Sequence, residues 1–321
     1  MRYPGISSEA FRHPLDYQAE QTLRSFPGFE LVARSFVEYL SERPQRIYFL
    51  GNYIKVGPRQ YATLYGIFRE CMRDLDMAVE PSLFVNQSPE VNAFALGQDR
   101  PSIVINAGLL DLLEEAEIRT VVAHELGHIK CSHTILRQMA IWAMGAAQML
   151  GEMTLGLGNA IGSGLIFAFY EWSRKAELSA DRAAFLVMDD LLPVMRTMMK
   201  MAGGSHKYAH ECSLDEFMRQ SESYQDLDRQ NGLNQFYKFM IYNGGRGTFL
   251  SHPFAVERVY HLREWSNSAE YSQIRDGNYA TDASGSVDVT PSDDEEAETL
   301  RRQIEELQAE IERIRSQRPD A

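Results

Sequence analysis

The chain has 321 residues, 44% of them hydrophobic, which is enough to bury the core of one large domain or of two small ones. Its formal net charge of −13 argues against nucleic acid as a partner, because the phosphates would repel the protein. Its three cysteines are an odd number, widely spaced, and form no CxxC pattern, so neither a disulfide framework nor a thiolate zinc site is indicated.

The first 57 residues (1–57) are expected to form an accessory N-terminal module. An amphipathic stretch covers about residues 29–40, and the runs IYFL and YIKV, joined by Gly51 and Asn52, predict a short hairpin. The first sixteen residues lack the basic and then apolar run of a secretory signal. Together with the cysteine usage, this predicts a protein that is not secreted and that resides in the cytoplasm or a plastid stroma.

The segment that follows is predicted to contain a helix and a small antiparallel sheet. Between residues 59 and 75, apolar side chains recur at spacings of four, three and four, as on one face of a helix: Leu64, Phe68, Cys71 and Leu75. Three short extended runs come next, SLFV, VNAFALG and SIVIN, separated by Asn, Pro, Gly and Asp. A further helix then carries the motif on which the functional interpretation rests.

The motif HELGH at residues 124–128 has the spacing of a metal-binding helix. At about 3.6 residues per turn, His124 and His128 project from the same face and can bind one zinc ion. Glu125 lies along the same side, where it can act as the general base on the attacking water without occupying the metal. The alternative is an ordinary amphipathic helix with surface histidines.

A catalytic zinc site needs a third protein ligand and one open position. The extension found in metzincins is missing, because Cys131 and Thr134 occupy its positions and His133 misses the register by one residue. A better candidate is Glu177, which stands four residues before Asp181 on a second predicted helix. Glu177 can complete the ligand set while Asp181 fixes the tautomer of a ligand histidine. Taken alone, the same run is also typical of a solvated acidic face.

The two predicted metal-binding segments are separated by an apolar stretch, residues 138–170, whose only charged residue is Glu152. The favoured interpretation is a hairpin packed over the core, and contact with a membrane or lipid surface is the first alternative. A membrane span is the second alternative, since the run after Glu152 has the necessary length. Four glycines together with Asn159 and Ser163 make that run a weak span.

The C-terminal part changes composition twice. Residues 267–295 are rich in Ser, Gly, Asp and Glu and are expected to form an acidic flexible linker. Residues 296–321 carry the apolar seam of a coiled-coil helix: Leu300, Ile304, Leu307, Ile311 and Ile314. We expect this helix to join copies of the chain in a homo-oligomer or to bind a partner helix. The alternative is that it docks on its own domain.

Three sequence blocks are specific in combination: HELGH at 124–128, SRKAELSAD at 173–181, and NAFALG at 92–97 followed by IVINAGLL at 103–110. Over about residues 58–265 they resemble the HtpX and CAAX prenyl protease family of zinc metalloendopeptidases, which are gluzincins. A softer likeness is Ser251-His252-Pro253 with Arg258 after it. The N-terminal region is similar to plastoglobule-associated plastid members and their bacterial relatives.

The resemblance implies an α+β, mostly helical fold with a zincin-like metallopeptidase domain over residues 58–266 and one Zn2+ per chain. It implies hydrolysis of peptide bonds in protein substrates. A substrate would lie extended along one strand and pair with its main chain: Asn92, Ala93, Phe94 and Ala95. His252 would donate to the developing oxyanion or act as a fourth ligand; the alternative is a turn residue before Pro253.

Two other functions remain open at this point. One is a zinc-stabilised, non-hydrolytic assembly or chaperone protein that oligomerises through its C-terminal helix. Glu125 argues against it, because a structural zinc site has no use for a base and usually closes with four ligands. The other is hydrolysis of an amide that is not a peptide.

Overall fold

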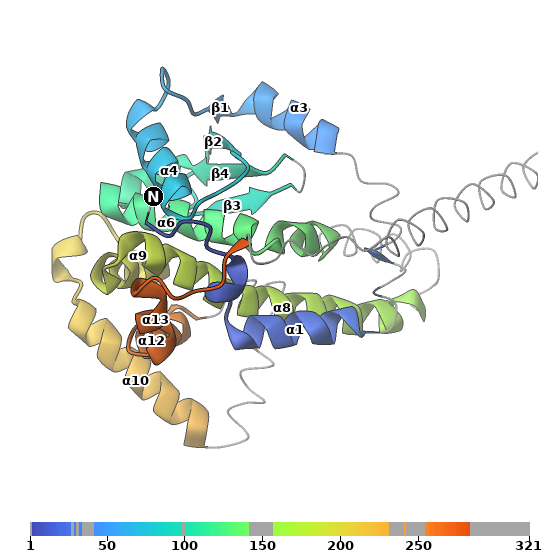
Figure 1. The fold of residues 1–321 in the computed structure, drawn as a ribbon, viewed down its shortest axis with the longest axis vertical. Coiled ribbons are helices and arrows are strands. Elements are labelled where there is room, and N and C mark those ends of the chain that lie inside the picture. The colour runs from blue at the N-terminus through green and yellow to red at the C-terminus, as the bar shows by residue number, and fades with distance from the viewer. Residues whose placement is uncertain are drawn as a thin grey trace, which may run out of the picture. The chain divides into compact units, whose positions relative to one another are not determined.

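Figure 1 shows the computed structural model, which describes residues 2–26, 29, 32–33, 42–97, 100–140, 157–230, 241 and 254–282. Met1–Ala280 form one compact unit. Its strands are β1 (Ile54–Lys55), β2 (Ser82–Asn86), β3 (Ala93–Leu96) and β4 (Ser102–Asn106). Its described helices are η1 (Ser8–Ala10), α1 (Pro14–Arg24), α3 (Glu42–Asn52), α4 (Ala62–Asp74), α5 (Ala107–Leu112), α6 (Glu115–Lys130), α8 (Leu157–Met188), α9 (Leu191–Gly203), η2 (Ala209–Glu211), α10 (Leu214–Gln230), α12 (Ala255–Ser266) and α13 (Ala269–Arg275).

The strands form one mixed sheet in the order β1-β2-β4-β3. The α+β, mostly helical fold and the three predicted strands are confirmed, but the sheet is not wholly antiparallel. β4 lies between β2 and β3. It runs parallel to β2, with Ser82 opposite Ser102, and antiparallel to β3, with Ala93 opposite Ile105. Among the described residues, β3 is therefore an edge strand.

The predicted hairpin of IYFL and YIKV is wrong. Residues 47–50 lie in α3, and β1 pairs antiparallel with β2, with Ile54 opposite Val85. A short apolar run carries no periodicity that separates a strand from a helical turn. Phe49 of this helix packs on Phe84 of β2 in a small buried cluster.

Helices α6 and α8 pack closely against each other and carry the motif residues. α6 begins with a capping box, in which the Glu117 carboxylate accepts a hydrogen bond from the backbone N–H of Glu114 at 2.8 Å. Gly127 lies inside the motif and faces α8, where a Cβ would come within 2.6 Å of the Ala183 Cβ. The glycine therefore lets the two helix backbones approach, and the HELGH face meets the helix that carries Glu177.

The N-terminal residues pack into the same compact unit as the residues that follow. α1 runs alongside α8 (Figure 1), and Leu23 shares a buried cluster with Phe169 and Trp172. His13 caps α1 by accepting a hydrogen bond from the backbone N–H of Leu15. Most of the predicted amphipathic stretch at 29–40 lies outside the described residues.

The folded unit extends beyond the predicted start of the linker at residue 267. α13 occupies part of that range, and its Tyr271 and Ile274 are buried. The Tyr271 ring stacks on Phe185 of α8, with ring centroids 4.6 Å apart. Two apolar anchors in an otherwise polar sequence are enough to hold one short helix, so composition alone placed the boundary too early.

The apolar stretch at 138–170 is described at 138–140 and 157–170. Met139, Leu165 and Phe169 are buried in the cluster that also contains Leu23 of α1. Within the described ranges, none of the helices combines the length and the apolar character that crossing a bilayer requires. The rest of this stretch and the predicted coiled coil at 296–321 lie outside the described residues.

Candidate metal centre

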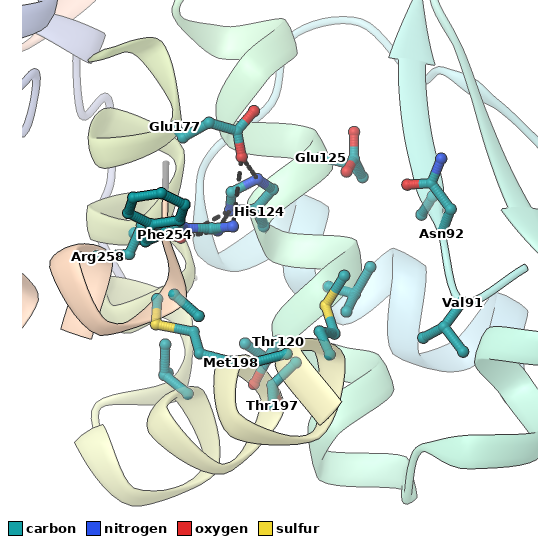
Figure 2. Close-up of a pocket in the computed structure, with 17 residues that line it drawn as sticks. Val91, Asn92, Thr120, His124, Glu125, Glu177, Thr197, Met198, Phe254 and Arg258 are labelled. Carbon is teal, nitrogen blue, oxygen red and sulfur yellow. Dashed lines mark hydrogen bonds and ion pairs between the residues drawn. The ribbon is translucent and has the colours of Figure 1, made fainter. Parts of the chain in front are cut away.

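Three buried side chains converge where α6 meets α8. His124 and His128 come from one face of α6, and their Nε2 atoms are 3.2 Å apart. Glu177 reaches across from α8: its Oε2 lies 3.2 Å from His124 Nε2 and its Oε1 lies 3.3 Å from His128 Nε2. Figure 2 shows Glu177 above His124 at the head of a pocket. The structure thus brings together the three residues that the sequence predicts as ligands.

This arrangement fits a zinc ion. Tetrahedral ligands at about 2.0–2.1 Å from zinc are separated from one another by about 3.3 Å. The two Nε2 atoms have this spacing, and each of them has it to one oxygen of the Glu177 carboxylate. Two imidazole nitrogens and one carboxylate are also ligands that zinc prefers. No other group of three His, Cys, Asp or Glu residues in the described part of the chain has such an arrangement.

Glu125 lines the same pocket but belongs to none of these contacts. It is 5% exposed, and its Oε2 is buried with no hydrogen-bond partner among the described residues. Burial raises the pKa of Glu125 above the ordinary glutamate value. A buried carboxylate oxygen with an unused lone pair beside a metal-ligand set is suited to accept a proton.

Asp181 stands behind His124, as the sequence predicts. Its Oδ1 lies 3.0 Å from His124 Nδ1, on the side of the ring away from Glu177. Burial opposes the charge on Asp181, but Arg258 and His124 outweigh that effect and lower the pKa of Asp181. Burial tends to lower the pKa of His124, but hydrogen bonds and charge interactions with Asp181 and Glu177 outweigh it and raise that pKa to about 9.

Arg258 of α12 also contacts the site, although the sequence analysis named it only as part of the likeness around His252 and gave it no role. Its Nε donates to Asp181 Oδ2 at 2.8 Å and its Nη2 to Asp181 Oδ1 at 2.5 Å. Its Nη1 also lies 3.5 Å from Glu177 Oε2. One guanidinium therefore fixes two carboxylates of the site. Arg258 is 77 positions from Asp181, and the only signal in the sequence was its place after the His-Pro segment.

His128 is supported on the opposite side. Its Nδ1 lies 3.0 Å from Nδ1 of His133, and His133 Nε2 lies 3.0 Å from Oδ2 of Asp16 on α1. Burial lowers the pKa of His128 to about 3, and the nearby Glu177 only partly opposes this. His133, which fails as a metzincin ligand, thus contacts a predicted ligand from behind.

A cavity of about 430 Å³ opens beside the predicted ligands. Asn92 and Ala93 line it next to β3, as predicted for a substrate strand, and apolar residues of α9 such as Met198 line it opposite (Figure 2). Phe94 and Ala95 are not in its lining: Ala95 is fully buried, and Phe94 packs on the cluster around Phe49. His252 lies outside the described residues.

Comparison with known proteins adds independent findings. The model of peptidase family M48 matches residues 58–266. The chain is 33% identical over 276 residues to "Plastoglobule-localized metallopeptidase 48, chloroplastic" of Arabidopsis thaliana, covering 85% of this chain and 76% of that protein. It is 28% identical over 201 residues to "Protease HtpX homolog" of Dictyoglomus thermophilum, covering 57% of this chain and 63% of that protein. The resemblance expected from the three sequence blocks is confirmed.

Proposed function

The chain belongs to peptidase family M48, and from that membership we propose that it is a zinc-dependent endopeptidase whose metal is held by His124, His128 and Glu177. Membership makes the chain a metallopeptidase. The proposal adds the identity of the metal, its ligands, and cleavage within a protein chain. The single observation that supports it most is the convergence of three buried side chains, in which the two Nε2 atoms lie 3.2 Å apart and each lies 3.2–3.3 Å from an oxygen of Glu177.

The proposed chemistry assigns one proton-transfer role to this chain. When bound, zinc supplies a Lewis acid that lowers the pKa of water and polarises a carbonyl oxygen. Glu125 would take the proton of the water that attacks the peptide carbonyl carbon, and would return it to the departing amine nitrogen. Its burial and raised pKa suit both steps, because the protonated form is accessible once the proton has been accepted.

A substrate is proposed to lie along the outer edge of β3, extended and paired through its main chain. An apolar side chain of the substrate would then enter the cavity, whose lining includes Val121, Val194 and Met198. His252 stays a prediction, either as a donor to the oxyanion or as a fourth ligand. The non-hydrolytic assembly protein is the weaker candidate, since it gives Glu125 no role.

We also propose peripheral contact with a lipid surface. The support is the uncharged character of 138–170 apart from Glu152, together with a relative whose name places it at plastoglobules in chloroplasts. Flotation with liposomes tests the contact. Protein that stays at the bottom of the gradient contradicts it, and protein that resists alkaline carbonate extraction contradicts a peripheral mode.

The enzymatic proposal is tested by metal analysis and by cleavage of an unfolded protein. We expect about one zinc per chain, loss of cleavage after dialysis against a chelator, and recovery when one equivalent of zinc is added. Mass spectrometry of the products should show cuts at internal positions. Products that differ from the substrate by terminal residues alone would make the chain an exopeptidase, and full cleavage by metal-free protein would refute the proposal.

A further inference from the structure

A line of buried polar groups connects the proposed metal site to the N-terminal helix. It runs from His128 on α6 through His133 to Asp16 on α1, with two separations of 3.0 Å. None of the side chains of His128, His133 and Asp16 is more than 4% exposed. Asp16 lies outside residues 58–266, the range that matches the family.

The direction of each hydrogen bond follows from the chemistry of His128 at one end of the line and of Asp16 at the other. A neutral imidazole that offers its Nε2 lone pair to a metal carries its proton on Nδ1. His128 Nδ1–H must then donate to His133 Nδ1, which requires that the proton of His133 be on Nε2. That proton points at Asp16, and a carboxylate can only accept. Metal binding by His128 and hydrogen bonding to Asp16 therefore require the same tautomers, with the proton on Nδ1 in His128 and on Nε2 in His133.

Asp16 is itself held in place as a carboxylate. Arg12 Nε donates to its Oδ2 at 2.9 Å, and the Ser179 hydroxyl donates to the same oxygen at 2.7 Å. The Ser179 hydroxyl in turn accepts a hydrogen bond from the backbone N–H of His13, which caps α1. Since Ser179 lies on α8 between Glu177 and Asp181, α1 is fastened to the helix that supplies the third ligand.

We propose that Asp16 is a positioning residue of the metal centre: acting through His133, it orients His128 and fixes the tautomer that leaves Nε2 free for zinc. This inference rests on the proposed zinc site. It assigns the N-terminal helix a part in metal binding, because the outer partner of a ligand histidine contributes to metal affinity.

The test compares Asp16→Asn with Glu20→Gln. Glu20 is a matched control, since it lies on the same helix, is also buried and also pairs with Arg12. Among the described residues, the polar partners of His133 are His128 and Asp16 and not Glu20. An asparagine amide can donate to the ring and favour the wrong tautomer. We expect Asp16→Asn to weaken zinc binding about tenfold to a hundredfold, measured by competition with a chelator. Glu20→Gln should bind zinc as the wild type does, although both variants should lower the melting temperature of the metal-free protein.

A second variant tests the same inference without changing Asp16. His133→Phe keeps an aromatic ring against Trp172 and leaves Asp16 its contacts with Arg12 and Ser179, but it removes both hydrogen bonds of the connection. We expect a loss of zinc affinity similar to that of Asp16→Asn. The double variant should lose no more than the larger single loss, because both changes interrupt one connection.

The outcomes separate this inference from the proposed function. If wild-type protein binds zinc no more tightly than Glu177→Ala, the proposed metal site is wrong and the inference falls with it. Tight wild-type binding that is unchanged in Asp16→Asn and in His133→Phe refutes the inference alone. So does a Glu20→Gln variant that loses as much affinity as Asp16→Asn, since the effect would then come from the stability of α1.

Discussion

His124 and His128 share one helix and one carboxylate neighbour, yet the further carboxylates that support them come from different parts of the chain, α8 for His124 and α1 for His128. His124 meets the carboxylate of Asp181 directly, at 3.0 Å. His128 meets the imidazole of His133, and the carboxylate of Asp16 lies one ring further out. In both cases an arginine donates to the carboxylate, Arg258 to Asp181 and Arg12 to Asp16. The first arginine–carboxylate pair lies within residues 58–266, the range that matches the family, and the second lies outside it.

Because of these different neighbours, the two imidazole rings differ in their pKa and hence in their charge. In the metal-free chain, the nearby carboxylates raise the pKa of His124 to about 9 despite its burial, whereas burial lowers the pKa of His128 to about 3. A histidine must be neutral to bind a metal. On the proposed assignment, zinc would have to displace a proton from His124 but not from His128. Two histidines that bind the same ion can thus differ in their protonation before it binds.

Glu177→Ala should have the largest effect on zinc binding. Glu177 lies against both His124 and His128, so the substitution removes one of the three proposed ligands from the metal itself. We expect zinc affinity to fall by more than about a hundredfold, beyond the range typical of an outer partner, and cleavage to fall with it. Excess zinc should restore part of both. Glu171→Ala is the control, since Glu171 is a largely exposed carboxylate on the same helix. Wild-type zinc affinity in Glu177→Ala would show that the third ligand is misassigned.

Asp181→Asn should weaken zinc binding more than Asp16→Asn, both within about tenfold to a hundredfold. The reason is distance: Asp181 touches a ligand ring, while Asp16 acts through an intervening one. Chelator competition on both proteins in parallel gives the ranking. A reversed order would mean that the connection through His133 is the stronger support.

Proton release on zinc binding should distinguish the two histidines. At pH 6, well below the raised pKa of His124 and above the lowered pKa of His128, the first ring is protonated in the metal-free protein and the second is not. Calorimetry in buffers of different ionisation enthalpy should then show about one proton released per zinc. Asp181→Asn should reduce that number, since the partner that favours the charged ring is weakened. An unchanged number would contradict the assigned cause.

Removal of residues 296–321 should have the smallest effect on the site. The predicted coiled-coil seam lies far from the metal ligands in the sequence, so zinc affinity and cleavage of a short peptide should stay at wild-type values. Light scattering should show a lower oligomeric state. The same number of chains per particle before and after truncation would refute the oligomer prediction. A loss of zinc affinity would show that residues 296–321 contribute to metal binding.

The sequence was sufficient for the parts of the site that are local. His124 and His128 share a helix face at a spacing of four, and so do Glu177 and Asp181, so periodicity alone predicted which side chains turn the same way. That the two faces meet required the likeness to a known family. The close approach at Gly127 is the physical reason that they can.

The contacts that the sequence could not predict join distant segments. Arg258 and Asp181 are 77 positions apart, and His133 and Asp16 are 117 positions apart, with no periodicity to relate them. The errors in the fold have a similar origin. Local pattern placed residues 47–50 in a strand and 267 onward in a linker. In the structure residues 47–50 lie in a helix that packs on Phe84, and residues 269–275 form a helix that packs on Phe185.

The central claim is that Glu125 serves as the base while three other residues hold the metal, and Glu125→Gln tests it most directly. The amide keeps the size of the side chain but cannot accept the proton. Zinc content should therefore match the wild type, while the rate of peptide cleavage should fall by about a hundredfold to ten-thousandfold. Cleavage at the wild-type rate by a zinc-loaded Glu125→Gln protein would contradict the account.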